Sequence, residues 1–258
     1  MIGSSKFTLE LLQAISDWQR GGSILQKEKR GKKIKELAIM LDPSFRIVSE
    51  KCYRQISLKK MYVWEMAEKL SLLETISSWT LDFEIAKDFK GGVPGRFQDD
   101  IGAIFSIDPK PENVIINLNK LYEDPHFISS CNDFKSEIVG YSTGIDRYRG
   151  EQKEVILEIH NLPIETIYSI GGHSSSKENL AKMFFRHTPN KFELAFFEYL
   201  LRTTGADKKI GPNWLTGAAK DRTISKWLYF QKHLSPFHRS RLQLEVRNNI
   251  DIQNPGTW

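Results

Sequence analysis

The residues best suited to chemistry are Gln152 and Glu154, which lie two positions apart at the start of the apolar run Val155-Ile156-Leu157. If this run is a β-strand, its side chains alternate between two faces, and Gln152 and Glu154 then share one face. An amide and a carboxylate held together can bind a sugar hydroxyl and orient an acceptor group. Taken alone, the pattern also fits an amphipathic strand that begins with a solvated Glu.

Two further polar signatures lie upstream in short apolar segments. Arg54 stands inside the first segment, where an isolated arginine is more often a salt-bridge partner at the sheet rim than a ligand-binding group. Ser78 and Thr80 are two apart in the second segment, so strand alternation places both on one face with Trp79 opposite. Each signature alone has this plain structural explanation.

In their order and spacing, Arg54, Ser78-Trp79-Thr80 and Gln152-Lys153-Glu154 resemble the mono-ADP-ribosyltransferase superfamily, in its branch with an Arg, Ser-x-Ser/Thr and Gln/Glu-x-Glu signature. The segment from Phe83 to Phe89 also resembles the helix that follows the second motif in the family. The resemblance covers roughly residues 50–170. It implies an α+β fold with a split β-sandwich core, and NAD⁺ as the co-substrate with no metal.

The resemblance also implies a role for each matched residue. Glu154 would bond the 2′-hydroxyl of the nicotinamide ribose and stabilise the positive charge that develops on the sugar as the nicotinamide bond breaks. Arg54 would bind the pyrophosphate, because a guanidinium fork matches phosphate oxygens. Ser78 would brace Glu154 or the nicotinamide side, Thr80 would support its strand, and Gln152 would orient the acceptor.

Three aromatic residues complete the candidate site. Phe89 and Phe97 are the candidates for the ring that stacks on nicotinamide. Tyr148 lies in the predicted loop Tyr141–Gly150, which we expect to meet the acceptor. Tyr148 could stack on a base or pack against a protein side chain, and a plain exposed aromatic is an equally good interpretation.

The amide at position 152 bears on the choice of acceptor. In the family, Glu at this place goes with transfer to Arg, whereas Gln goes with other acceptors, including Asn side chains and nucleobases. An amide both donates and accepts hydrogen bonds, whereas a carboxylate only accepts them. Arg is therefore disfavoured as the target of this chain.

Hydrophobic periodicity predicts the elements that position these residues. Residues 7–40 read as two amphipathic helices with a break at Gly21-Gly22-Ser23. One further helix should follow Thr80, with Phe83, Ile85, Ala86 and Phe89 on its inner face. The predicted strands are Cys52–Ile56, Thr75–Thr80, Ile101–Ile107, Val114–Leu118, Val155–Ile159 and Thr166–Ile170.

This pattern predicts two parts of the chain. Residues 1–171 form a catalytic domain, with N-terminal helices over 1–50 and a β-rich core over 51–171. Residues 172–258 form a basic, mainly helical extension, with helices over 192–201 and 223–234.

The charge is distributed unevenly along the 258 residues, whose net charge is +5. Residues 1–50 hold 9 Lys and Arg against 6 Asp and Glu, and residues 170–258 hold 14 against 7, whereas the middle segment, residues 51–169, holds 14 against 19. Basic flanks can steer a polyanion toward a central site, and they can equally be solvated helix faces or the docking surface for an acidic partner.

The composition is that of a globular protein. No run of about 18 apolar residues is present, and the N-terminus lacks the pattern of a secretory signal, so we expect a cytoplasmic protein with no membrane partner. Cys52 and Cys131 are too few for a disulfide framework and stand apart from any His cluster that would suggest zinc.

The leading hypothesis is an NAD⁺-dependent mono-ADP-ribosyltransferase that acts as an intracellular toxin or phage-defence effector. Gln152 and the basic tail, which carries Trp214, Trp227, Tyr229, Phe230 and Phe237, slightly favour RNA or single-stranded DNA as the acceptor over a non-Arg protein side chain. Most of these aromatics also fit a helix core. The alternatives are an NAD⁺ glycohydrolase and an inactive nucleic-acid or protein binding module. An acidic antitoxin is a further expected partner.

Overall fold

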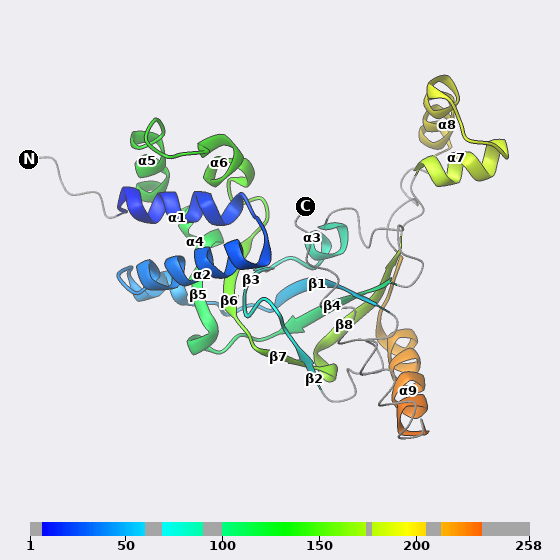
Figure 1. The fold of residues 1–258 in the computed structure, drawn as a ribbon, viewed down its shortest axis with the longest axis horizontal. Coiled ribbons are helices and arrows are strands. Elements are labelled where there is room, and N and C mark those ends of the chain that lie inside the picture. Colours follow the sequence, from blue (N-terminus) through cyan, green and yellow to red (C-terminus); the bar gives the residue numbers. More distant parts are fainter. Residues whose placement is uncertain (1–6, 60–68, 90–99, 174–176, 205–212, 234–258) are drawn as a thin grey trace, which may run out of the picture.

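The computed structural model describes residues 7–59, 69–89, 100–173, 177–204 and 213–233. It shows a mixed α/β protein built on one antiparallel sheet with helices around it (Figure 1). The strand order in this sheet is β5-β6-β3-β1-β4-β8-β9. Its strands are β1 (Cys52–Lys59), β3 (Ile76–Thr80), β4 (Asp100–Ile107), β5 (Val114–Asn117), β6 (Glu154–Glu158), β8 (Ile167–His173) and β9 (Asn213–Leu215). A separate two-stranded sheet pairs β2 (Lys69–Ser71) with β7 (Asn161–Pro163).

The large sheet is divided near its middle. β1 and β3 pair at a single position, where Tyr53 faces Thr80. On either side the pairing is longer: β1 pairs with β4 from Cys52 to Lys59, and β3 pairs with β6 along its whole length. The sheet therefore consists of two well-paired halves, β5-β6-β3 and β1-β4-β8-β9, joined by one residue pair.

Two N-terminal helices cover the first half, as the periodicity predicts. α1 (Leu9–Gln19) begins at Thr8, whose hydroxyl accepts from the Leu11 N–H, and α2 (Ile24–Ala38) begins with a capping box formed by Ser23 and Gln26. The break between them confirms the prediction, since Gly21 and Gly22 adopt positive φ angles of 71° and 140°.

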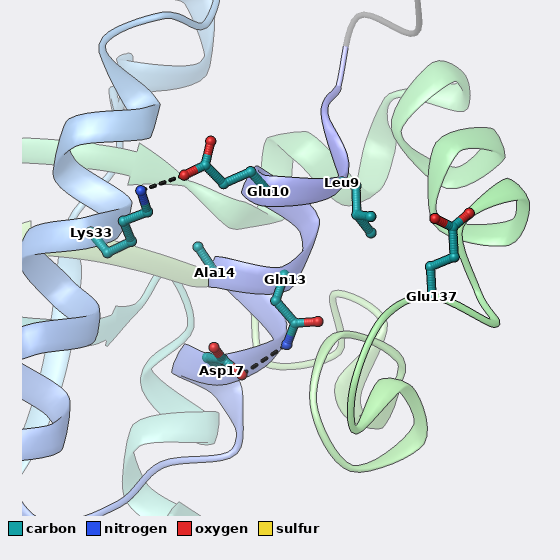
Figure 2. A pocket seen from close by; sticks show the side chains of 7 residues that line it. All are labelled: Leu9, Glu10, Gln13, Ala14, Asp17, Lys33 and Glu137. Atoms are coloured by element: carbon teal, nitrogen blue, oxygen red, sulfur yellow. Dashed lines mark hydrogen bonds and ion pairs between the residues drawn. The ribbon is translucent and has the colours of Figure 1, made fainter.

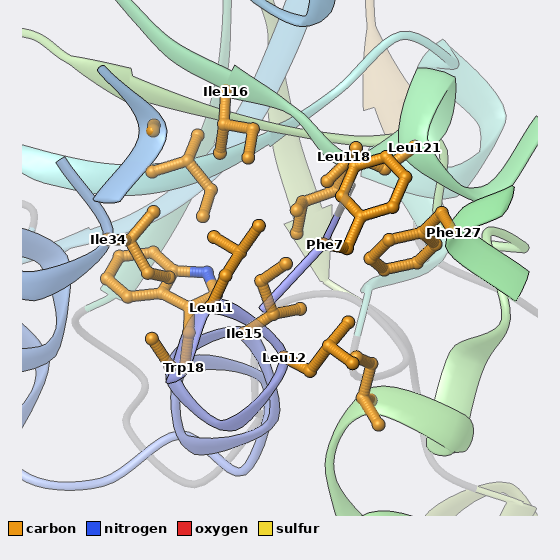
Figure 3. Close-up of a cluster of buried hydrophobic side chains, with 14 of the residues drawn as sticks. Phe7, Leu11, Leu12, Ile15, Trp18, Ile34, Ile116, Leu118, Leu121 and Phe127 are labelled. Carbon is orange, nitrogen blue, oxygen red and sulfur yellow. The ribbon is translucent and has the colours of Figure 1, made fainter. Parts of the chain in front are cut away.

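The larger hydrophobic core lies between α1, α2 and the β5-β6-β3 half (Figure 3). α1 contributes Leu12, Ile15 and Trp18 to it, and all three are buried. Each fully buried aliphatic side chain contributes about 1.5–3 kcal/mol relative to its exposed state. Further core members come from α2, from strands β5 and β6 and from the helices that follow β5. They include Ile34, Ile116, Leu118, Leu121, Phe127 and Ile156.

The connection between β5 and β6 is largely helical. It contains α4 (Leu118–Glu123), α5 (Pro125–Asp133), a 3₁₀ turn over Tyr141–Thr143 and α6 (Ile145–Tyr148). The prediction of a loop over Tyr141–Gly150 is therefore wrong for most of that segment. These helices are too short for a clear hydrophobic period. Their N-caps are the features of the sequence that indicate helices here, because Asn117 and Asp124 each cap a helix and Pro125 directly follows Asp124.

A second core lies on the opposite face of the sheet. Its members include Trp79, Phe105, Val155 and Leu157, and Trp227 of the C-terminal part packs against them. The predicted opposition of Trp79 to Ser78 and Thr80 is thereby confirmed.

α3 (Phe83–Asp88) follows β3 as expected, with Asp82 as its N-cap. Ala86 is buried, and the Phe83 ring contacts Tyr168 at a centroid distance of 4.8 Å. Phe89 does not belong to an inner face, since it is 44% exposed where the helix ends.

The C-terminal part contains α7 (Lys177–Phe185), α8 (Lys191–Thr203) and α9 (Gly217–His233), which broadly confirms its predicted helices. β9 pairs with β8 and α9 contacts the same strand, so this part also adds a strand to the sheet. α7 and α8 project away from the sheet (Figure 1). No helix in the described ranges is long and apolar enough to cross a membrane.

Candidate active site

The pairing of β3 with β6 brings Ser78 and Glu154 together. Thr80 lies directly opposite Glu154 and Ser78 opposite Ile156, so these side chains share one face of the sheet. The Ser78 hydroxyl donates a hydrogen bond to Glu154 Oε1. Two motifs that are 76 residues apart in the sequence therefore form one polar unit.

α1 supplies two further donors to the same carboxylate. Trp18 Nε1 donates to Glu154 Oε1 at 2.9 Å, and Gln19 Nε2 donates to Oε2 at 3.2 Å. Trp18 Nε1 also lies 3.1 Å from Ser78 Oγ. Glu154 is only 6% exposed, so these hydrogen bonds take the place of most of its hydration.

A tyrosine on α4 lies behind the Gln19 amide. The Tyr122 hydroxyl lies 2.9 Å from Gln19 Oε1 and 2.5 Å from the main-chain oxygen of Ile145, and its single proton serves one of these two acceptors. Burial raises the pKa of Tyr122, so the hydroxyl stays protonated. The orientation of the Gln19 amide follows from Glu154, because a carboxylate oxygen accepts and the amide nitrogen must therefore face it.

The electrostatic character of the site follows from its partners. Among the described residues, no lysine or arginine forms an ion pair with Glu154, and its donors are an indole, an amide and a hydroxyl. Ser78 is exposed, whereas Trp18 and Gln19 are buried, so Ser78 is the most accessible member of this hydrogen-bonded group.

Gln152 lies outside the strand, and the prediction that alternation places it beside Glu154 is wrong. β6 begins at Glu154, and Lys153 before it has a φ of 45°, which interrupts the extended chain. Gln152 is instead part of a tight turn. The Thr80 hydroxyl donates to the main-chain oxygen of Gln152 at 2.8 Å, and Lys153 Nζ binds Asp82 at 2.8 Å.

Arg54 lies on β1 and forms its ion pair elsewhere. Its Nη2 lies 3.2 Å from Glu74 Oε2, and Lys27 of α2 binds the other oxygen of Glu74 at 2.9 Å. Burial lowers the pKa of Arg54, an effect that Glu74 opposes. Arg54 Nη1 is buried and has no hydrogen-bond partner among the residues that the structure describes.

The three aromatic candidates do not gather around Glu154 in the described residues. Tyr148 is half-buried at the end of α6, where the Arg147 guanidinium lies 4.9 Å from its ring centroid. Phe89 is exposed at the end of α3. Phe97 lies outside the described residues.

A surface groove of about 380 Å³ lies along the outer side of α1 and does not include Glu154 (Figure 2). Gln13 donates to Asp17 at 2.9 Å, and Lys33 of α2 forms an ion pair with Glu10. Because these polar groove residues pair with one another, the groove gives no indication of a ligand-binding site. The groove is lined by Leu9, Glu10, Gln13, Ala14, Asp17, Lys33 and Glu137.

Two other kinds of chemistry find no support. Within the described ranges, no group of three or more His, Cys, Asp or Glu side chains could hold a metal ion. Burial raises the pKa of both the Cys52 and the Cys131 thiol to about 12, so neither is a ready nucleophile.

Trp18, Gln19 and Tyr122 complete the surroundings of Glu154, and the sequence motifs do not predict them. Trp18 is buried on the apolar side of α1. A buried indole N–H needs an acceptor, and a Gln directly after it at the helix end was the available signal. The acceptor itself is 136 residues away, so the pairing depends on the tertiary fold.

No protein-family model, no curated protein and no solved structure matches the chain.

Proposed function

We propose that the chain is an NAD⁺-dependent mono-ADP-ribosyltransferase in which Glu154 is the central catalytic group. The observation that carries the proposal is the hydrogen bond from Ser78 to the buried carboxylate of Glu154 across the β3–β6 pair. By the sequence resemblance, Glu154 would bind the nicotinamide ribose and Ser78 would brace Glu154 or the nicotinamide side. The single pair that joins β1 to β3 supports the finer assignment of a split β-sandwich core.

The arrangement suits the chemistry of this transfer. The bond between ribose C1′ and the nicotinamide nitrogen breaks, and nicotinamide leaves with the bonding electrons. The ionised Glu154 stabilises the positive charge that develops on the ribose. The acceptor atom then bonds to C1′ and loses its proton.

The two carboxylate oxygens of Glu154 differ in how many further hydrogen bonds each can accept. Oε1 accepts from both Trp18 and Ser78, whereas Oε2 accepts from Gln19 alone. A carboxylate oxygen has two lone pairs, so Oε2 retains one for a ribose hydroxyl.

Arg54 fits a role in binding the pyrophosphate of NAD⁺. Its buried Nη1 lacks a partner, and phosphate oxygens satisfy guanidinium donors well. Glu74 would remain on Nη2 and hold the guanidinium in place. The chemistry of this donor therefore matches the group it would bind.

The proposed acceptor is RNA or single-stranded DNA, on the grounds of Gln152 and the basic C-terminal part. We further propose that the protein acts in the cytoplasm as a toxin or defence effector, and that an acidic antitoxin neutralises it. Co-purification with an acidic protein would support this last point.

An NAD⁺ glycohydrolase, with water as the acceptor, is the second candidate. The observation that favours it is the position of Gln152 ahead of β6, where its main-chain oxygen is the atom held by Thr80. In this case Glu154 and Arg54 remain essential and Gln152 becomes dispensable.

The test is incubation of the purified protein with NAD⁺ labelled in its ADP-ribose part, together with total RNA, single-stranded DNA or cell protein. Glu154→Ala serves as the inactive control. Label on one polymer, absent in the control, supports the transferase and identifies the acceptor class, with protein as the alternative to nucleic acid. Nicotinamide release without labelled polymer supports the glycohydrolase. No turnover in either form supports a binding module and overturns the proposal.

A further inference from the structure

α8 presents a stripe of exposed aromatic side chains. Phe192, Phe196 and Tyr199 are 88%, 52% and 63% exposed. Their i, i+4, i+7 spacing places them on one side of the helix. Large apolar side chains that gather on one exposed face mark interaction sites more often than isolated ones do.

The stripe is not needed to hold the α7–α8 hairpin together. Phe197, on the other side of α8, is buried and contacts the rings of Phe184 and Phe185 of α7 at centroid distances of 5.5 and 6.4 Å. A capping box formed by Asn190 and Glu193 starts α8. The packing side and the exposed aromatic side of this helix are therefore separate.

Two basic side chains, Lys191 and Arg202, lie along one flank of the stripe on α8. Lys182 and Arg186 are exposed on α7, the neighbouring helix of the hairpin. None of the four forms an ion pair with another described residue. Over residues 177–204 there are five Lys and Arg against three Glu, so the hairpin has a net charge of +2.

We propose that the α8 stripe, Phe192, Phe196 and Tyr199, with Lys191 and Arg202 on its flank, is a binding surface for single-stranded nucleic acid. Its aromatic rings stack on bases and its cations bind phosphates. The hairpin projects from the sheet (Figure 1), and the three rings of the stripe are exposed on it.

The chemistry of the surface favours this ligand. Side chains three or four apart on a helix have Cβ atoms about 5–6 Å apart. This is wider than the spacing of about 3.4 Å per nucleotide in a stacked strand. Successive rings can therefore each receive one base of an unstacked strand, whereas a duplex keeps its bases paired and offers only its phosphates.

The inference extends the proposed function, because it gives the transferase a place to hold a nucleic-acid acceptor. Binding is measured without NAD⁺, so it can fail or succeed independently of catalysis. The probe is a fluorescein-labelled RNA of mixed sequence, about 12 nucleotides long, which is within the usual site size for single-strand binding. Its anisotropy is followed as the full-length protein is added. The variants are Phe192→Ser with Phe196→Ser, and Lys191→Gln with Arg202→Gln.

We expect the aromatic double variant to weaken binding at least about tenfold, because each stacked ring contributes a factor of about 5 or more. The basic double variant should reduce the slope of log affinity against log salt by about 0.7 for each phosphate that is no longer neutralised. Leu25→Ser, on α2 at an equally exposed apolar site, and Lys110→Gln should each leave binding unchanged.

Four outcomes would overturn the proposal. In the first, the aromatic double variant binds as tightly as the wild type. In the second, light scattering shows a wild-type dimer that the double variant converts to a monomer, which assigns the stripe to a second copy of the chain. In the remaining two, poly-glutamate or anionic lipid vesicles compete for the stripe as effectively as unlabelled RNA.

Discussion

α1 and α8 are both rich in apolar side chains, yet the structure uses them in opposite ways. α1 buries Leu12, Ile15 and Trp18 against the sheet, and its Trp18 and Gln19 also bind the Glu154 carboxylate. α8 buries only one large side chain, Phe197, and leaves an aromatic stripe in water. An apolar helix face therefore indicates burial only where another element covers it. α1 supplies buried hydrogen-bond donors to the candidate active site, whereas α8 presents exposed aromatic side chains on the surface of the protein.

The largest expected difference is in stability. Leu12→Ala, in the core beneath α1, should lower the free energy of unfolding by about 2–5 kcal/mol, because it removes buried apolar surface and leaves a cavity. Urea denaturation measures this effect. A decrease below about 1 kcal/mol would mean that α1 is not packed as described.

The next effect concerns the donor role of α1. Trp18→Phe retains an aromatic ring but removes the N–H that binds Glu154 Oε1. A hydrogen bond to a charged group is worth about 1.5–3 kcal/mol, so nicotinamide release should slow by about 10- to 100-fold.

A positioning role for Trp18 can be separated from a packing role. In Trp18→Phe, kcat should fall while KM for NAD⁺ changes little. Trp227→Phe, in the second core, is the matched control and should retain its rate. Equal decreases in both variants would assign Trp18 to packing alone.

Gly144 tests how closely α1 approaches the helices that follow β5. A Cβ added at Gly144 would lie 2.5 Å from the main-chain oxygen of Ser16 in α1, which is too close for unstrained packing. Gly144→Ala should therefore destabilise the protein by about 1–3 kcal/mol. Thermal unfolding measures the change, and an unaltered midpoint would contradict this close approach.

The turn before β6 predicts a smaller, pH-dependent effect. The hydrogen bond from Lys153 lowers the pKa of Asp82 below its usual value of 3.8. The stabilisation is thus present above about pH 4 and decreases as the pH falls through the lowered pKa. The contribution should be small, since Lys153 is exposed and water screens the pair.

Asp82→Asn should remove this contribution at neutral pH and flatten the decrease of stability between about pH 5 and about pH 2. Lys153→Gln removes the same ion pair from the other side and should act similarly. A wild-type pH profile in both variants would contradict the role of the pair in holding the turn.

The smallest expected effect on the free energy of unfolding is that of a substitution on α8. Phe192→Ala should change the free energy of unfolding by no more than about 0.5 kcal/mol, although it removes a larger side chain than Leu12→Ala does. Urea denaturation under identical conditions compares the two directly. A decrease near that of Leu12→Ala would show that Phe192 is covered in solution.

The sequence predicts most of the sheet, because local alternation reveals both β3 and β6. The meeting of Ser78 with Glu154 was implied only by the family resemblance, as one of two roles for Ser78. The position of Gln152 could not be predicted in this way, because a positive φ at Lys153 breaks the period of two.

The donors to Glu154 and the partner of Arg54 depend on longer-range packing. Trp18 reaches the carboxylate only because α1 crosses β3 and β6. Glu74, the partner of Arg54, lies in a connection between strands that carries no motif. The plain alternative for Arg54, a salt bridge, is present, but on the inner strand β1 and not at the rim of the sheet.

The central claim is that Glu154 acts as an ionised carboxylate in the cleavage of NAD⁺. The most direct test is the rate of nicotinamide release from NAD⁺ by the wild type and by Glu154→Gln, which retains the size of the side chain but removes its charge. We predict a decrease of about 100- to 1,000-fold, with the unfolding midpoint shifted by only a few degrees. A rate within about threefold of the wild type, in a folded variant, would contradict the account.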